Sequence, residues 1–133
     1  MPISLDNVFG VHEAALRLRA QRTEILASNL ANADTPNYKA RDIDFQAAMK
    51  QASTEQGARS LKTTHKGHIS GVSGSGMEDY VKFRLPTQPA LDGNTVETHV
   101  EQAAFARNAM EYQATLRFFE GKSKSIIGAL KGE

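Results

Sequence analysis

Two histidines, His65 and His68, are the residues of this chain best suited to metal chemistry, because they stand three positions apart. On a helix, imidazoles at this spacing can share one metal ion. Here Gly67 lies between them in a stretch dominated by Ser, Thr, Gly and Lys, and no carboxylate or third ligand has a recognisable spacing. The sequence therefore favours solvated loop histidines, and a small enzyme built on a His-bound metal stays as a minor alternative.

Two other patterns resemble catalytic motifs without their context. Gly71–Gly76 has the glycines of a phosphate-binding loop, but it lacks the preceding strand, the following helix and the Lys-Ser/Thr pair of such a loop. Asp42 and Asp44 flank Ile43, but nothing near these carboxylates predicts the burial that would raise a pKa. We interpret them as a solvated turn, and we predict no catalytic residue, no metal, no cofactor and no small-molecule substrate.

The composition also argues against several classes of partner. The 133 residues contain 16 Lys and Arg against 15 Asp and Glu, which gives no electrostatic case for binding nucleic acid or an acidic membrane. Cysteine is absent, which excludes disulfides, thiolate metal sites and a cysteine nucleophile. No apolar run approaches the roughly 18 residues of a transmembrane helix, and the N-terminus lacks the pattern of a cleaved signal peptide. We expect a soluble protein made in the cytoplasm, without direct membrane insertion.

Residues 5–33 are predicted to form one long helix, with Ser4 as a candidate N-cap. Apolar residues lie along it in two rows, which together are wider than a single narrow seam. At about 1.5 Å per residue the helix would be roughly 43 Å long, so it needs partners on both apolar sides. The residues expected to pack are Leu5, Val8, Phe9, Val11, Leu16, Leu18, Ile25, Leu26 and Leu30.

A second long helix is predicted from about Thr98 to Leu130, and Thr98 and Glu101 have the spacing of a capping box at its start. Its large side chains alternate at intervals of four and three residues, which is the pattern of a heptad seam. The predicted assembly seam consists of Phe105, Ala109, Tyr112, Leu116, Phe119, Ile126 and Leu130.

The middle region, residues 34–97, is predicted to be irregular. Pro36 lacks an N–H and disfavours helix at Thr35, which ends the first helix. The expected parts are an extended or turn segment at Ala40–Phe45, about two turns of helix at Phe45–Ala52, a flexible loop at about residues 53–76, a strand at Tyr80–Leu85 and a turn at Leu91–Asn94.

These elements predict a mainly α fold in which the two long terminal helices pair antiparallel as a coiled-coil-like axial layer, with a short helix and a little β structure between them. The three parts, residues 1–33, 34–97 and 98–133, together form one assembly domain in this interpretation. A two-helix hairpin of this length cannot bury both wide apolar faces by itself. The faces left over indicate assembly with copies of itself or with related chains.

The stretch Ser28–Lys39 is more specified than a helix end needs to be. It reads Ser-Asn-Leu-Ala-Asn-Ala-Asp-Thr-Pro-Asn-Tyr-Lys and resembles the N-terminal signature of the flagellar basal-body rod, hook and hook-associated axial proteins. The usual form ends in Thr-Pro-Gly-Tyr, so Asn37 stands at the glycine position, and we expect a positive φ there because Asn tolerates the left-handed region. The signature residues are Asn29, Leu30, Ala31, Asn32, Ala33, Asp34, Thr35, Pro36, Asn37 and Tyr38.

Shorter segments resemble the proximal rod branch of this family. Hook and distal rod proteins are much longer and carry large inserted β domains, for which this chain has no room. The resemblance covers both ends of the chain and leaves roughly residues 53–79 unconstrained. The segments that carry it are Leu18–Arg22, Glu24–Leu26, Ala40–Phe45, Leu91–Val96 and Tyr112–Ala114.

The resemblance implies a structural subunit of the flagellar rod. Such subunits are exported unfolded by the flagellar type III apparatus without a cleaved signal, and they assemble into a helical tube inside the MS ring and across the periplasm that transmits torque. The implied partners are other copies, other rod subunits, the adaptor protein FliE and the export gate. Related export substrates use a Phe followed four residues later by a hydrophobic residue, a spacing that Phe45 and Met49 share.

A cytoplasmic coiled-coil adaptor or export chaperone is the main alternative. It would share the two long helices, but it would not need the Asn32–Tyr38 signature and it would stay in the cytoplasm. Cell fractionation separates these two hypotheses.

Overall fold

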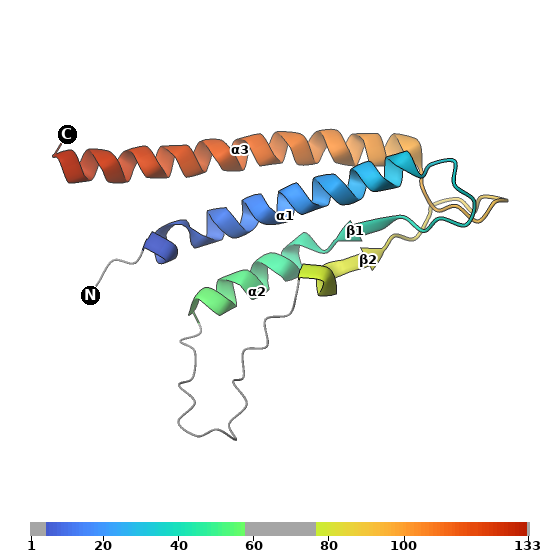
Figure 1. Cartoon of the computed structure of the whole chain (residues 1–133), viewed down its shortest axis with the longest axis horizontal. Helices are drawn as coiled ribbons and strands as arrows, with labels where there is room; N and C mark the ends of the chain where they lie inside the picture. Colours follow the sequence, from blue (N-terminus) through green and yellow to red (C-terminus); the bar gives the residue numbers. More distant parts are fainter. Residues whose placement is uncertain (1–4, 58–76, 133) are drawn as a thin grey trace, which may run out of the picture.

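The structure is a computed structural model that describes residues 5–57 and 77–132, with side chains described for residues 9–54 and 79–132. Two long helices, α1 (Leu5–Ala31) and α3 (Thr98–Lys131), lie side by side and antiparallel, so that the start of α1 and the end of α3 lie at the same end of the molecule (Figure 1). The prediction of a mainly helical fold with paired terminal helices is confirmed.

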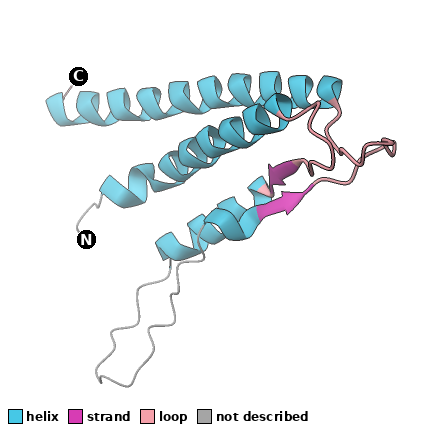
Figure 2. Ribbon diagram, turned by 45° about the vertical axis from the view of Figure 1, so that its right-hand side comes forward, coloured by secondary structure: helices cyan, strands magenta, loops and turns pink. Residues whose placement is uncertain are grey.

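A smaller arm lies against α1 on the side away from α3 (Figure 2). It contains β1 (Arg41–Ile43), α2 (Phe45–Gly57), the 3₁₀ turn η1 (Met77–Tyr80) and β2 (Val81–Phe83). The two strands pair antiparallel, with Asp42 opposite Lys82. The expected extended segment is therefore strand β1, and the predicted strand Tyr80–Leu85 is shorter, because Tyr80 belongs to η1.

The short predicted helix is longer than expected, since α2 continues to Gly57. Ser53 and Thr54 lie inside this helix, where their hydroxyls donate back to the carbonyl of Lys50, a bond that Ser and Thr side chains make within helices. The predicted loop at residues 53–57 was thus wrong. The rest of that loop, with His65, His68 and Gly71–Gly76, lies outside the described residues.

A small apolar core fastens the arm to α1. Leu18, Ile43 and Ala48 are buried in it, so it joins α1, β1 and α2. The half-buried side chains around this core are Ile25, Phe45, Met49, Tyr80 and Val81.

The start of α3 differs from the predicted capping box. Glu97, not Thr98, is the N-cap residue, and its side chain makes no capping bond. The Glu97 carboxylate instead accepts hydrogen bonds from the hydroxyl and N–H of Thr87 and the N–H of Gln88, and the Thr87 hydroxyl is the leading cause of a lowered pKa at Glu97. Glu101 is fully buried. Its carboxylate accepts hydrogen bonds from Asn29 of α1 and from Arg84, so these partners occupy the side chain that the capping box would require.

Candidate assembly site

The side chains of α3 that are buried against α1 are polar, and they form a seam with less polar surface on each side. Glu101, Asn108 and Thr115 recur at the heptad interval, and each is at most 9% exposed. Asn108 Nδ2 donates to the Arg19 carbonyl and to Thr23 Oγ1, both at 2.9 Å. The apolar heptad pattern does not reveal this seam, because its three residues are polar; their spacing of seven residues is the signal that would have predicted it.

Arg19 is the charged group nearest the middle of this seam. Its guanidinium pairs with Glu111 of α3 and lies 4.5 Å from the centre of the Phe45 ring, so it touches both neighbouring elements. Arg107 binds the same carboxylate at 3.1 Å. Burial pushes the pKa of Glu111 upward, but the hydrogen bonds from Arg19 and Arg107 outweigh it and hold the pKa below its ordinary value.

Asn29 joins α1 to both β1 and α3 and is fully buried. Its Nδ2 donates to the Arg41 carbonyl at 2.7 Å and to Glu101 at 3.1 Å, and its Oδ1 accepts from the Arg41 N–H at 3.1 Å. The Tyr38 hydroxyl donates to the same oxygen at 3.3 Å. The Asn29 amide thus binds the edge of β1 as a neighbouring strand would.

An ion network runs from α1 through β1 and Arg84, the residue after β2, to α3. Arg22 binds Asp42 with two parallel bonds of 2.8 and 2.9 Å, Arg84 binds the same carboxylate, and Arg84 also binds Glu101 at 2.6 Å. Burial raises the pKa of Asp42, but the two arginines outweigh it and leave the pKa lowered. The hydrogen bond to Asp42 likewise raises the pKa of Arg22. The interpretation of Asp42 as part of a solvated turn was therefore wrong.

Asp44, the other carboxylate of that predicted turn, begins α2. Its Oδ1 accepts from the Ala47 N–H at 3.1 Å, which is a helix N-cap bond, and Lys82 binds its other oxygen at 2.7 Å. The bond from Lys82 is the main cause of a lowered pKa at Asp44.

The signature turn after α1 is held by the segment Leu91–Val96. Asn94 is buried, and its Nδ2 donates to the carbonyls of Asn32, Ala33 and Thr35 at 3.0, 2.7 and 2.9 Å. The Thr95 N–H donates to the Tyr38 carbonyl at 3.0 Å. Two motifs that the sequence singled out separately therefore form one clamp.

Asn37 has φ 62°, which confirms the expected left-handed conformation at the glycine position of the signature. Its N–H donates to the Asp92 carbonyl at 2.9 Å. Gly93 faces it with φ 74°, and a Cβ there would lie 2.6 Å from Asn37 Oδ1. Gly93 therefore serves both the left-handed turn and the close approach of the two segments.

The structure distributes the predicted signature residues between the interior and the surface. Asn29 is buried, and the half-buried residues are Leu30, Asn32, Ala33 and Tyr38, whereas Ala31, Asp34, Thr35, Pro36 and Asn37 are exposed.

The predicted packing residues of α1 divide in the same way. Leu18 and Leu26 are buried, Val11 is exposed, and the half-buried residues are Phe9, Leu16, Ile25 and Leu30. The side chains of Leu5 and Val8 lie outside those described.

The predicted seam of α3 is only partly covered by α1. The half-buried residues are Phe105, Tyr112, Phe119 and Ile126, and the exposed ones are Ala109, Leu116 and Leu130.

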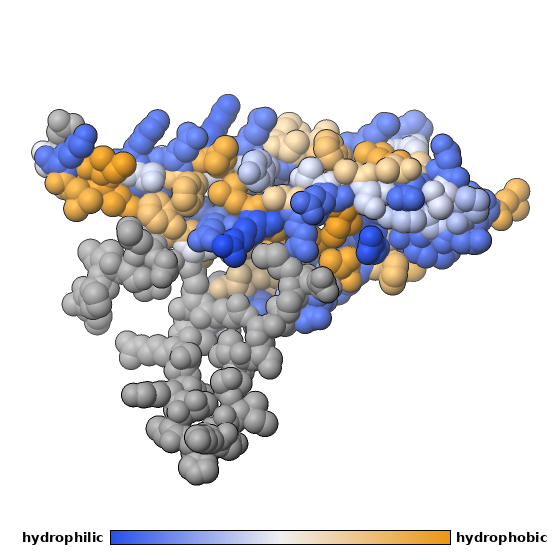
Figure 3. Space-filling model, in the orientation of Figure 1, coloured by the Kyte–Doolittle hydropathy of each residue, from blue (hydrophilic) through white to orange (hydrophobic). Residues whose placement is uncertain are grey.

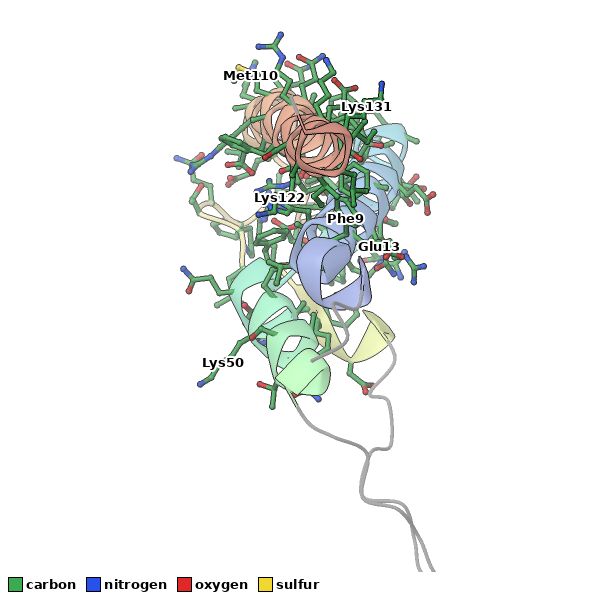
Figure 4. All side chains as sticks on the ribbon, turned by 90° about the vertical axis from the view of Figure 1, so that its left-hand side faces the viewer. Phe9, Glu13, Lys50, Met110, Lys122 and Lys131 are labelled. Atoms are coloured by element: carbon green, nitrogen blue, oxygen red, sulfur yellow. The ribbon has the colours of Figure 1, made fainter. Side chains whose placement is uncertain are left out.

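Apolar side chains remain exposed on both sides of the polar seam. At 100° per residue, Leu116 and Ile127 lie roughly 90° from the seam on one side of α3, which we call the first lateral face. Val100 and Phe118 lie roughly 90° away on the other side, the second lateral face. Their exposed fractions are 38% and 51%, and 45% and 67%. Met110 points away from α1, whereas Phe9 lies between the helices (Figure 4).

Each lateral face adjoins a groove between α1 and α3. The groove of the first face has a volume of about 370 Å³ and is lined by Ala20, Thr23, Glu24, Ala109 and Tyr112. The groove of the second face measures about 500 Å³, and Arg19, Arg22, Phe45, Ala103, Ala104, Arg107 and Glu111 line it. The space-filling view shows further apolar surface at the C-terminal end of α3 (Figure 3).

In the described part of the chain, no helix is both long enough and apolar enough to cross a bilayer. Among those same residues, no three His, Cys, Asp or Glu side chains group in a way that could hold a metal ion.

Comparison with known proteins defines the class. Residues 9–39, which run from α1 through the signature turn, match the sequence model of the family described as "Flagella basal body rod protein". This match covers most of α1 and the signature turn, and it indicates the class of flagellar basal body rod proteins.

Full-length relatives narrow the class to one family. A flagellar basal body rod protein FlgB of Aeromonas hydrophila is 46% identical over 100% of this chain and 99% of its own length. FlgB of Cereibacter sphaeroides is 45% identical over 93% of this chain and 94% of its own, and FlgB of Salmonella typhimurium is 42% identical over 96% of both. The chain belongs to the FlgB family of flagellar basal body rod proteins.

Membership settles the broad role. The chain is a structural subunit of the rod in the flagellar basal body and assembles with other rod components, and its family is structural rather than enzymatic. The alternatives of a cytoplasmic adaptor and of a His-metal enzyme are set aside by this membership.

Proposed function

We propose that the subunit packs into the rod through the two lateral faces of α3. The observation that carries this proposal is the exposure of Leu116 and Ile127 on one side of the polar seam and of Val100 and Phe118 on the other. Large apolar side chains on two sides of one helix favour a neighbour on each side, and the two grooves offer space for the neighbours' side chains.

In this proposal the helices carry the axial load, and the signature turn sets the direction in which the arm leaves the helix pair. Residues 1–33 and 98–133 form the axial layer, residues 34–97 form the outward part, and the three act as one assembly domain. The clamp by Asn94 and the ion network around Asp42 support such a role, because they hold the arm to the helix pair at a fixed angle. A stiff joint of this kind suits a subunit that transmits torque.

The finer assignments rest on the family resemblance. We propose that the chain is exported by the flagellar type III apparatus without a cleaved signal and assembles helically within the MS ring and periplasm. Its proposed partners are copies of itself, other rod subunits, the adaptor FliE and the export gate with the MS ring. Pull-down of basal bodies with a tagged chain would test these contacts one by one.

The test of the lateral faces is a set of lysine substitutions in a strain that lacks the native gene. Leu116→Lys and Phe118→Lys each place a charge on one lateral face, while Gln113→Lys places it on the exposed polar stripe between them. We expect the first two to abolish swimming and rod recovery in isolated basal bodies, and the third to leave both intact. Circular dichroism of the purified chains should be the same for all three. Normal rods with both face variants would overturn the proposal.

Phe45 and Met49 stay a proposed export element. In the folded chain both pack on the core that includes Leu18, so the element would be read in the unfolded chain. We expect Phe45→Ala and Met49→Ala to lower the amount of chain secreted into the periplasm. Leu18→Ala is the matched control, because it weakens the same core without changing the element. Equal secretion of all these variants and the native chain would remove the assignment.

A further inference from the structure

The two edges of the small sheet differ. In antiparallel pairing with Arg41 opposite Phe83, the backbone groups of Arg41 and Ile43 point to the outer edge of β1, and those of Val81 and Phe83 point to the outer edge of β2. On β1, the Asn29 amide binds both backbone groups of Arg41, and Asp42 Oδ1 accepts from the Ile43 N–H. The outer edge of β1 is therefore largely closed, because side chains bind three of its four outward backbone groups.

The outer edge of β2 is open. Within residues 5–57 and 77–132, the outward N–H and C=O groups of Phe83 and the outward C=O group of Val81 have no hydrogen-bond partner, whereas the Val81 N–H directly follows η1 and closes the last i→i+3 bond of that turn. Both views place β2 farther from the helix pair than β1, so this edge faces outward (Figures 1 and 2). The side chains that alternate along it are apolar, and Phe83 is 72% and Leu85 88% exposed. An open edge with exposed apolar side chains is a template for another strand.

We infer that this edge pairs with the same edge of a second copy of the chain, antiparallel and centred on Phe83. This register places Phe83 opposite the second copy's Phe83 and Val81 opposite its Leu85, so the apolar row is self-complementary. The charges on the other face do not oppose it. Lys82 is bound by Asp44, and Arg84 is bound by Asp42 and Glu101, so each cation brings its counter-charge.

The closed edge of β1 limits the association to two copies. A sheet with two open edges could add strands without limit. Here each copy has one open edge, that of β2, and a two-fold dimer pairs the open edges of both copies with each other. The contact is small, since it involves a strand of three residues and its neighbour Leu85. We therefore expect a weak dimer of the free chain, with a dissociation constant of about 10⁻⁵ to 10⁻³ M.

Single-cysteine cross-linking tests the pairing and its register, because the native chain contains no cysteine. Opposite residues of a hydrogen-bonded antiparallel pair have Cα atoms about 5.5 Å apart, within the range that a disulfide spans. Phe83→Cys should give at least about tenfold more covalent dimer than Leu91→Cys, a control at a fully exposed turn. A mixture of Val81→Cys and Leu85→Cys chains should form the mixed dimer in preference to either homodimer.

Sedimentation equilibrium of the full chain provides the second measurement. The native chain should shift from monomer towards dimer as concentration rises, and Phe83→Lys should abolish the shift while its circular dichroism stays native. Equal cross-linking at positions 83 and 91, or a native chain that stays monomeric at millimolar concentration, would overturn the inference. Association beyond the dimer would overturn the one-sided closure of the sheet. The inference does not rest on the lateral faces, so its failure leaves the proposed function intact.

Discussion

The two ends of the helix pair are held by different kinds of contact. At the junction end, Asn29 and Asn94 bind the backbone of the signature turn and of β1, and the ion network ties α1 to α3 through the arm. At the opposite end, where α1 starts and α3 ends, the contact between the helices includes Phe9 and Phe119, whose ring centres lie 5.0 Å apart. Hydrogen bonds have direction, whereas apolar contacts are largely non-directional.

This difference indicates a division of labour within one subunit. The junction end fixes its own geometry without help, because its buried polar groups have partners within the chain. The other end leaves Ile127 and Leu130 exposed, so neighbours can complete it. Substitutions at the two ends should therefore affect different measurements, folding at the first and assembly at the second.

The largest effect on folding is expected from Asn29→Ala. The change removes four hydrogen bonds and leaves the Arg41 backbone and buried Glu101 short of partners, so we expect a loss of about 3 kcal/mol in the free energy of unfolding. Urea denaturation at neutral pH measures it. Asn32→Ala is the control of the same residue type, because that side chain is only half-buried and should cost less. Equal losses of stability in the two variants would mean that the contacts of Asn29 do not stabilise the junction more than those of a half-buried asparagine do.

Asp42→Asn should have the next largest effect, about 2 kcal/mol, because a neutral amide cannot balance both Arg22 and Arg84. The ion pairs of Asp42 with Arg22 and Arg84, and those of Glu111 with Arg19 and Arg107, also predict how stability depends on pH. The folded pKa values of Asp42 and Glu111 are lowered, so the unfolded chain binds more protons and stability is lost as pH falls below about 5. Denaturation at a series of pH values should show a flatter dependence in the variant. A native chain whose stability rose towards acid pH would contradict this.

Phe119→Ala tests the other end. The ring is only half-buried in the free subunit, so we expect a loss of about 1 to 1.5 kcal/mol, smaller than that of Asn29→Ala although the deleted side chain is larger. Urea denaturation measures the loss, and a motility assay should show a greater defect than that loss explains. If Phe119→Ala unfolded the free chain more easily than Asn29→Ala, the comparison of the two ends would be reversed.

The smallest change is expected from Asn37→Gly. Glycine adopts the left-handed conformation without cost, so the free energy of unfolding should stay within about 0.5 kcal/mol of the native value. Asn37→Ala should lose about 1 kcal/mol, because its Cβ disfavours that conformation. Thermal melts of the two variants side by side distinguish these outcomes, and a glycine variant less stable than the alanine one would show that the amide matters more than φ.

The sequence was sufficient for the parts that depend on local pattern. Two periodic helices, a helix end before Pro36 and the positive φ of Asn37 follow from spacing and backbone preference, although α1 ends at Ala31, two residues earlier than predicted. The buried role of Asp42 could not be predicted, because it depends on Arg22 and Arg84, which come near only after folding. Glu101 was misplaced for the same reason, since its capping-box spacing is local and its actual partners are distant.

The contacts between α1 and α3 join residues that are far apart in the sequence, and this separation affects how the chain folds. Arg19 reaches Glu111 across 92 positions, Asn108 reaches Arg19 across 89, and Asn29 reaches Glu101 across 72. Contacts between residues so far apart in the chain close long loops, and closing long loops slows folding. During synthesis the first helix lacks these partners until the last quarter of the chain has left the ribosome. The chain therefore remains incompletely folded until α3 has been synthesised and can pack against α1.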